Sequence, residues 1–124
     1  MKYSNTSTMS IELSKKEKKI ARELIEKGLQ AEFRQCLESI DLILQRWKDK
    51  ETNGEDSYRS LYKTVKDFDK HIVGRYDRLS GSMYVFVLAG LLHDKLISED
   101  DLNEMEEAVR NGVLFVAREI GTSP

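Results

Sequence analysis

Apolar residues recur at helical spacing through the first part of the chain. Between residues 14 and 48 they return every three or four positions, which places them on one side of an α-helix. Ser14 and Glu17 form the Ser-x-x-Glu pattern of a capping box at the start of this stretch, and a helix tolerates an isolated glycine such as Gly28. The pattern therefore predicts one long helix over 14–48.

The apolar side of this helix is wide. It consists of two adjoining heptad rows, wider than the seam of a two-stranded coiled coil. A helix of about 35 residues is roughly 50 Å long, whereas a globule of this size has a radius of gyration of about 14 Å. We therefore expect a second copy of the chain to cover the rows, although a break near Gly28 that folds the helix back on itself is an alternative. The predicted dimer interface consists of Leu29, Phe33, Cys36, Leu37, Ile40, Ile43, Leu44 and Trp47.

A second amphipathic helix is predicted over 57–73. It follows a polar stretch in which Asn53-Gly54 is a strong turn signal, and Asp56 can cap its start. Gly74 is expected to end it as a left-handed residue.

The last third of the chain predicts two more helices. The uniformly apolar stretch over 83–92 (MYVFVLAGLL) predicts a helix over 82–95 that is buried on all sides. Ser98 and the acidic residues after it then cap a C-terminal helix over 99–120, which Gly121 ends. The sequence thus predicts an all-α fold in a single helical domain over 14–121, with residues 1–13 frayed or disordered.

Composition narrows the classes of function. The chain has 124 residues, and 20 Lys and Arg against 22 Asp and Glu leave a net charge of -2, without the basic surplus typical of proteins that bind phosphates. The single cysteine, Cys36, excludes an intrachain disulfide. No apolar run approaches the roughly 20 residues of a membrane helix. We expect a cytoplasmic protein that binds neither nucleic acid nor membranes.

Few residues suggest catalysis. His71 and His93 lie near predicted helix ends without the partners of a metal site, and Cys36 lies on the apolar stripe, where cysteine behaves as a small hydrophobe. We expect no enzyme activity, no metal and no cofactor. The lysine-rich start of the first helix, Lys15–Lys19, supports an alternative function, that of a helical nucleic-acid-binding domain.

Three segments resemble the fluorescence recovery protein family. They are 69–77 (DKHIVGRYD), 85–92 (VFVLAGLL) and 96–102 (LISEDDL). The family has an Ile-x-Gly-(Lys/Arg)-Tyr-Asp turn, then an apolar helix and an acidic stretch. Its turn motif corresponds here to Gly74, Arg75, Tyr76 and Asp77, in which Gly74 permits a positive φ and Asp77 can cap the next helix.

The resemblance implies shorter helices that form a small head beside the long helix, and an elongated antiparallel homodimer. It also implies a regulator without enzyme activity, which binds the photoactivated orange carotenoid protein and speeds its return to the dark form. Arg59, Tyr62 and Lys63 stand where the family has a Trp-x-x-His-Asp pattern, and Asp69 stands where it has a downstream Arg, so those roles are not carried over. The client is either such a carotenoid protein or a different one. The candidate partner-binding residues are Tyr58, Arg59, Tyr62, Arg75 and Tyr76.

Overall fold

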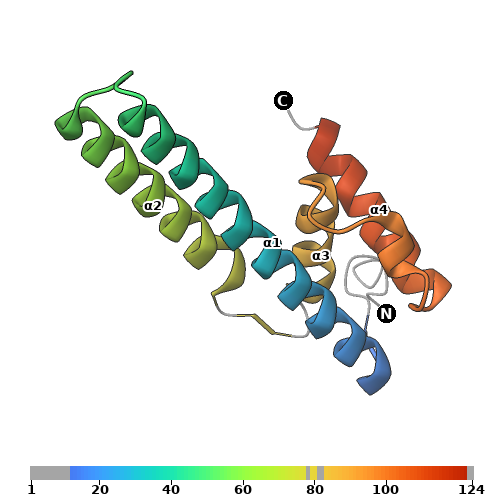
Figure 1. Cartoon of the computed structure of the whole chain (residues 1–124). Helices are drawn as coiled ribbons and strands as arrows, with labels where there is room; N and C mark the ends of the chain where they lie inside the picture. The colour runs from blue at the N-terminus through green and yellow to red at the C-terminus, as the bar shows by residue number, and fades with distance from the viewer. Residues whose placement is uncertain (1–11, 78, 81–82, 123–124) are drawn as a thin grey trace. The chain divides into compact units, whose positions relative to one another are not determined.

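The computed structural model describes residues 12–77, 79–80 and 83–122. All regular structure in this part of the chain is helical, so the all-α prediction is confirmed (Figure 1). The elements are α1 (Lys15–Lys48), α2 (Gly54–Tyr76), α3 (Tyr84–His93), a short 3-10 helix (Glu99–Leu102) and α4 (Glu107–Thr122). The prediction that residues 1–13 are disordered falls largely outside the described residues, and Leu13 itself is buried.

The chain forms two compact units whose boundary falls inside α1. The first, here called the core unit, consists of residues 1–28 and 78–124. The second, here called the hairpin unit, consists of residues 29–77. In it, α2 folds back beside the second half of α1 after a short turn (Figure 1). Because α1 is unbroken at Gly28, the alternative in which the helix breaks there is wrong.

The core unit contains all the buried hydrophobic side chains among the residues that the structure describes. Its largest fully buried apolar residues are Leu88, Leu91, Leu102 and Val113, which come from α3, the 3-10 helix and α4. The prediction that α3 is buried on all sides is wrong, because Phe86 is 39% exposed. The predicted range 82–95 also extended beyond the helix, which spans Tyr84–His93.

Gly28 lets α3 approach α1 closely. A Cβ atom at this position would lie 2.7 Å from Leu91 Cδ2 and 2.8 Å from Leu91 Cδ1. The Leu91 side chain is itself fully buried, so it has little room to move away. Gly28 lowers the helix propensity of α1, but it leaves the space that the Leu91 side chain needs.

A buried carboxylate links the start of α1 to the start of α4. The backbone N–H of Glu17 donates to Ser14 Oγ at 3.1 Å, as half of the predicted capping box. The other half is absent, because the Glu17 carboxylate is buried and accepts the backbone N–H of Glu106 at 3.0 Å. The Glu17 side chain, which was expected to cap α1, instead accepts the backbone N–H of the residue that precedes α4.

The boundaries of α2 differ from the predicted range of 57–73. Asn53 caps the helix, since its side-chain oxygen accepts the Asp56 N–H at 2.7 Å, so the residue expected as the cap lies inside the first turn. Gly74 does not end the helix, which continues to Tyr76. Asp77 is the C-cap of α2, whereas the residue that precedes α3 is Met83.

The predicted helix over 99–120 is interrupted. Ser98 begins only the short 3-10 helix, where the Asp101 carboxylate accepts the Ser98 N–H at 2.8 Å. The chain then turns before α4 starts at Glu107. Gly121 lies within α4, which ends at Thr122, so its predicted role as a stop is wrong.

Lysines occupy the left-handed positions that glycine normally takes. Lys50 has a φ of 63° and Lys95 a φ of 64°, and among the described residues no glycine has a positive φ. Both lie at the ends of helices in the Schellman arrangement. After α3, the Leu96 N–H donates to the Leu91 carbonyl at 2.8 Å. The sequence signal for a left-handed cap pointed to Gly74, and the structure places these caps elsewhere.

Two glycine substitutions test this account of packing. The higher helix propensity of alanine should add about 1 kcal/mol to the free energy of unfolding in Gly28→Ala. The added methyl group overpacks a rigid site, however, which should lower it by about 1–3 kcal/mol. We expect a net loss of about 1 kcal/mol in the free energy of unfolding, measured by urea denaturation.

Gly74→Ala is the matched control. No atom lies within 4 Å of a Cβ built at Gly74. Only the effect of helix propensity then remains, and we expect the free energy of unfolding of Gly74→Ala to rise by up to about 1 kcal/mol. Equal effects of the two substitutions would contradict the close approach of Leu91.

Candidate functional site

The hairpin unit encloses no hydrophobic core. All 16 buried hydrophobic residues of the described chain belong to the core unit. In the hairpin unit, whose residues are all described, the buried side chains are those of Glu32 and Ser57, and both are polar. Two helices alone thus leave their apolar residues at most half-buried, which marks this unit as the candidate interface.

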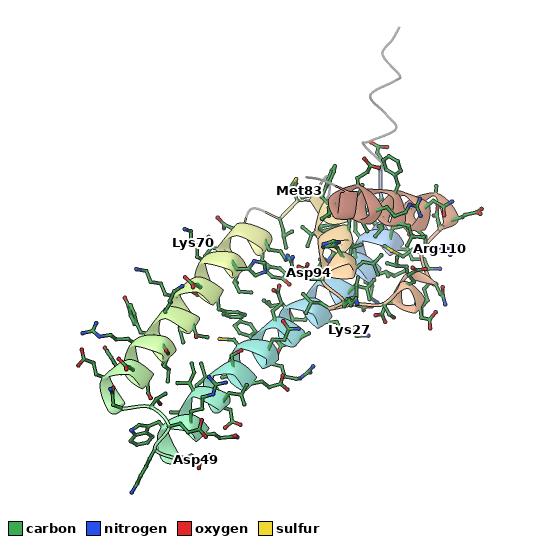
Figure 2. All side chains as sticks on the ribbon, turned by 90° about the horizontal axis from the view of Figure 1, so that it is seen from above. Lys27, Asp49, Lys70, Met83, Asp94 and Arg110 are labelled. Atoms are coloured by element: carbon green, nitrogen blue, oxygen red, sulfur yellow. The ribbon has the colours of Figure 1, made fainter. Side chains whose placement is uncertain are left out.

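The residues of the predicted dimer interface separate into two groups on α1. Leu29, Cys36, Ile40 and Ile43 are half-buried, whereas Phe33, Leu37, Leu44 and Trp47 are exposed. Leu37 is 64% exposed, the largest fraction among them. The half-buried positions of Cys36 and Ile43 place that row on the side of α2. The second row is exposed to solvent. Figure 2 shows the side chains of the hairpin unit, with Asp49 just after the end of α1 and Lys70 on α2.

The exposed apolar residues of α2 lie beside this open row. On helices with 3.6 residues per turn, Phe33 and Leu44 lie about 70° round the axis from the row that faces α2. Tyr58, Tyr62 and Val65 are rotated in the same sense, by about 90°, from the side of α2 that faces α1. The two helices run antiparallel. Residues that are rotated in the same sense from the contact between the helices therefore lie on the same face of the hairpin. We call this the apolar face. On α1 it consists of the exposed Phe33, Leu37, Leu44 and Trp47 with the half-buried Ile40 between them, and on α2 it consists of Tyr58, Tyr62 and Val65.

Two hollows lie along α1 in this unit. An apolar pocket of about 260 Å³ lies where α1 ends and α2 begins. Its lining comes from both helices and consists of Leu44, Trp47, Gly54, Ser57, Tyr58 and Leu61. A second, open depression lies on α1 itself, lined by Gln30, Phe33, Arg34, Leu37, Glu38 and Asp41. The pocket has the size and apolar lining to take a large hydrophobic side chain.

A polar cluster around Glu32 holds α2 against α1. The Glu32 carboxylate accepts hydrogen bonds from Arg75 Nη1 at 3.1 Å and from the Tyr76 hydroxyl at 2.5 Å. Its other oxygen lies 2.7 Å from His71 Nε2. Beside it, the rings of Phe33 and Phe68 lie 5.4 Å apart. The cluster supplies a buried anchor in a unit that has no buried hydrophobic one.

The cluster gives Arg75 and Tyr76 a structural role in this chain. Arg75 and Tyr76 belong to the last turn of α2, where their polar groups are directed to Glu32. Burial, followed by the hydrogen bond to Glu32, raises the pKa of Tyr76 above its ordinary value. Sequence reasoning assigned these residues to a turn and did not single out Glu32, because a glutamate inside a helix carries no local signal of burial.

The other candidate partner-binding residues are exposed on α2. Tyr58 is 68% and Tyr62 58% exposed. Arg59 forms an exposed ion pair with Glu55 at 3.0 Å, within one turn of the same helix. The structure thus places Tyr58 and Tyr62 on the apolar face, while Arg75 and Tyr76 are engaged within the chain.

The residues considered for catalysis each have a different setting in the fold. Cys36 is a free, half-buried cysteine of α1, His71 belongs to the Glu32 cluster, and His93 is the last residue of α3. Among the described residues, no three or more His, Cys, Asp and Glu side chains are grouped so that they could hold a metal ion. Within the same residues, no helix combines the length and apolar character needed to cross a membrane.

Comparisons with protein-family models, with curated proteins and with solved structures found no match to this chain.

Glu32→Gln tests the anchor. The substitution keeps the size of the side chain but removes the charge that Arg75 and the Tyr76 hydroxyl approach, and hydrogen bonds to charged groups contribute about 1.5–3 kcal/mol. We expect the free energy of unfolding by urea to fall by about 2 kcal/mol. Glu38→Gln, at an exposed position of the same helix, is the control and should change it by less than about 0.5 kcal/mol. A similar effect of both substitutions would exclude an anchoring role.

Tyr76 gives the anchor a pH dependence. Because the pKa of Tyr76 is raised in the folded chain, the folded state holds the phenol proton more tightly than the unfolded chain does. This contribution is complete below the usual tyrosine pKa of about 10. It is lost as the pH rises from there through the raised pKa. We expect the free energy of unfolding to fall less steeply above about pH 10 in Tyr76→Phe than in the unmodified chain. Parallel pH profiles would contradict it.

Proposed function

We propose that this protein is a non-enzymatic helical regulator that acts as a homodimer and binds a client protein. One observation carries the proposal: the hairpin unit presents a row of large exposed apolar side chains and has no buried one. Contiguous exposed apolar surface rimmed by polar residues is characteristic of protein-binding sites.

The composition of the apolar face supports a protein partner. Trp47, Tyr58 and Tyr62 are amphipathic aromatic residues of the kind that contribute most at protein interfaces. Burying apolar surface is worth about 25 cal/mol per Å². The half-buried residues between α1 and α2 would also lose their remaining contact with water when the face is covered.

The family resemblance supports a client of the orange carotenoid protein type. In this chain the motif residues Arg75 and Tyr76 hold Glu32, so the motif supports the proposal through the geometry of the hairpin rather than through a contact with the client. The exposed side chains of Tyr58, Arg59 and Tyr62 are the candidates for direct contact. A binder that prefers one state of a client shifts the client toward that state.

Ile40→Asp tests the dimer. Ile40 lies in the middle of the five α1 residues of the apolar face, here called the α1 strip. A second copy would bury an unpaired carboxylate at this position, at a high free-energy cost. We expect sedimentation equilibrium at micromolar concentrations to give a dimer for the unmodified chain and a monomer for Ile40→Asp. A client that needs the dimer should then bind the unmodified chain but not Ile40→Asp. The photoactivated carotenoid protein is the first client to test, through the rate of its return to the dark form. We expect the unmodified chain to change that rate weakly or not at all, because the residues at the family's binding positions differ.

Leu42→Asp is the matched control. Leu42 is 55% exposed and lies on the opposite side of α1, about 180° from the apolar face. This variant should remain dimeric and active on the client. A monomeric unmodified chain contradicts the homodimer, whereas a dimer that leaves the carotenoid protein unaffected excludes that client and points to another protein.

A second candidate function has one specific observation in its favour. Glu17 lies within the lysine-rich first turns of α1, but its carboxylate is buried against Glu106. Lys15, Lys16 and Lys19 are therefore exposed without that neutralising charge at the surface. Binding of labelled DNA or RNA that weakens steeply with salt would favour a nucleic-acid-binding function.

A further inference from the structure

The spacing of the α1 strip restricts how a second copy can cover it. Leu37 and Leu44 occupy the a positions of a heptad, and Phe33, Ile40 and Trp47 the d positions. Two such strips that run antiparallel interlock when the a positions of one helix face the d positions of the other. Two registers with several apolar layers satisfy this condition. Their two-fold axes pass between the two copies of α1, either at the level between Glu38 and Ser39 or at the level of Leu42.

Charges at the edge of the strip distinguish the registers. The e positions, at the edge away from α2, are Arg34, Asp41 and Lys48. With the axis at Leu42, Arg34 faces Lys48 of the second copy and the two Asp41 side chains face each other. With the axis between Glu38 and Ser39, Arg34 faces Asp41 of the second copy, and the two-fold symmetry makes this pair twice. Only the second arrangement brings opposite charges together.

The side chains of this pair are available. In the part of the chain that the structure describes, no ion pair or hydrogen bond involves the Arg34 side chain, and the Asp41 carboxylate accepts only from Gln45 Nε2, at 2.8 Å. Arg34 and Asp41 lie seven residues apart, about 10 Å along the axis. Both line the open depression on α1, which spans the level of the proposed axis.

We propose the register of the homodimer on the apolar face: the two copies of α1 pack antiparallel, and the two-fold axis passes between them at the level between Glu38 and Ser39. Leu37 then faces the second copy's Ile40, and Arg34 forms an ion pair with its Asp41. This inference rests on the proposed homodimer and adds to it the register and the residues that set it.

The second helix agrees with the same axis. Phe33 is level with Phe68, so the midpoint between Glu38 and Ser39 is level with the part of α2 near Lys63. Tyr62 and Val65 lie on either side of that level and face each other across the axis. Two hairpins joined in this way form a four-helix bundle.

The apolar pocket is filled in this arrangement. In the proposed register Phe33 of the second copy lies opposite Leu44, which is part of the wall of the pocket of about 260 Å³. Phe33 is 42% exposed within one copy, and an aromatic ring suits an apolar pocket of this size. The register therefore pairs an exposed ring with a hollow that the single copy leaves open.

A charge swap tests the register in the full chain. Arg34→Glu and Asp41→Arg each place two like-charged pairs across the axis, and each should weaken the dimer by about tenfold in sedimentation equilibrium at low salt. The double variant restores opposite charges in the reversed order. Its dissociation constant should return to within about threefold of the unmodified chain.

Arg46→Glu is the control, because Arg46 is exposed on α1 about 140° away from the centre of the strip. It should leave the dissociation constant unchanged. A dimer in which the double variant is as weak as the two single variants together overturns the register while leaving the proposed function intact. A monomeric unmodified chain overturns both.

Discussion

A helix pair has too little interior to enclose a hydrophobic core, and the hairpin unit follows from this constraint. The apolar residues of the hairpin unit stay exposed or half-buried. All 16 buried hydrophobic residues of the described chain lie in the core unit. Helices usually gain most of their stability from the packing of an amphipathic face. In the hairpin unit much of that stabilisation is still to be gained from a partner, and the protein-binding role proposed for it has this physical basis.

The Glu32 cluster takes the place of a core between α1 and α2. A carboxylate held by Arg75, Tyr76 and His71 fixes which residues of the two helices meet, whereas apolar contacts alone permit neighbouring registers. Buried charge pairs contribute little net stability, and their value lies in the cost of any arrangement that separates them. Here that specificity aligns Tyr58 and Tyr62 with the exposed strip of α1.

Periodicity was sufficient to predict the helices, because α1 and α2 carry the repeat of three and four over many turns. The ends of the helices were harder to predict. Gly74 and Gly121 lie inside helices, while the left-handed positions fall on lysines, since the hydrogen bonds around a helix end outweigh the preference of one residue. The α1 side of the candidate site was predictable from the apolar rows. Glu32 was not, because its partners lie about 40 residues away along the chain.

The left-handed lysines have a consequence for protein engineering. An L-residue in this conformation is less favourable than glycine by roughly 1 kcal/mol. Lys50 and Lys95 are both exposed at the ends of helices, away from buried side chains. Replacement of either lysine by glycine would relieve local strain without altering a packed surface. These two positions are therefore suitable for raising the stability of the protein for crystallisation.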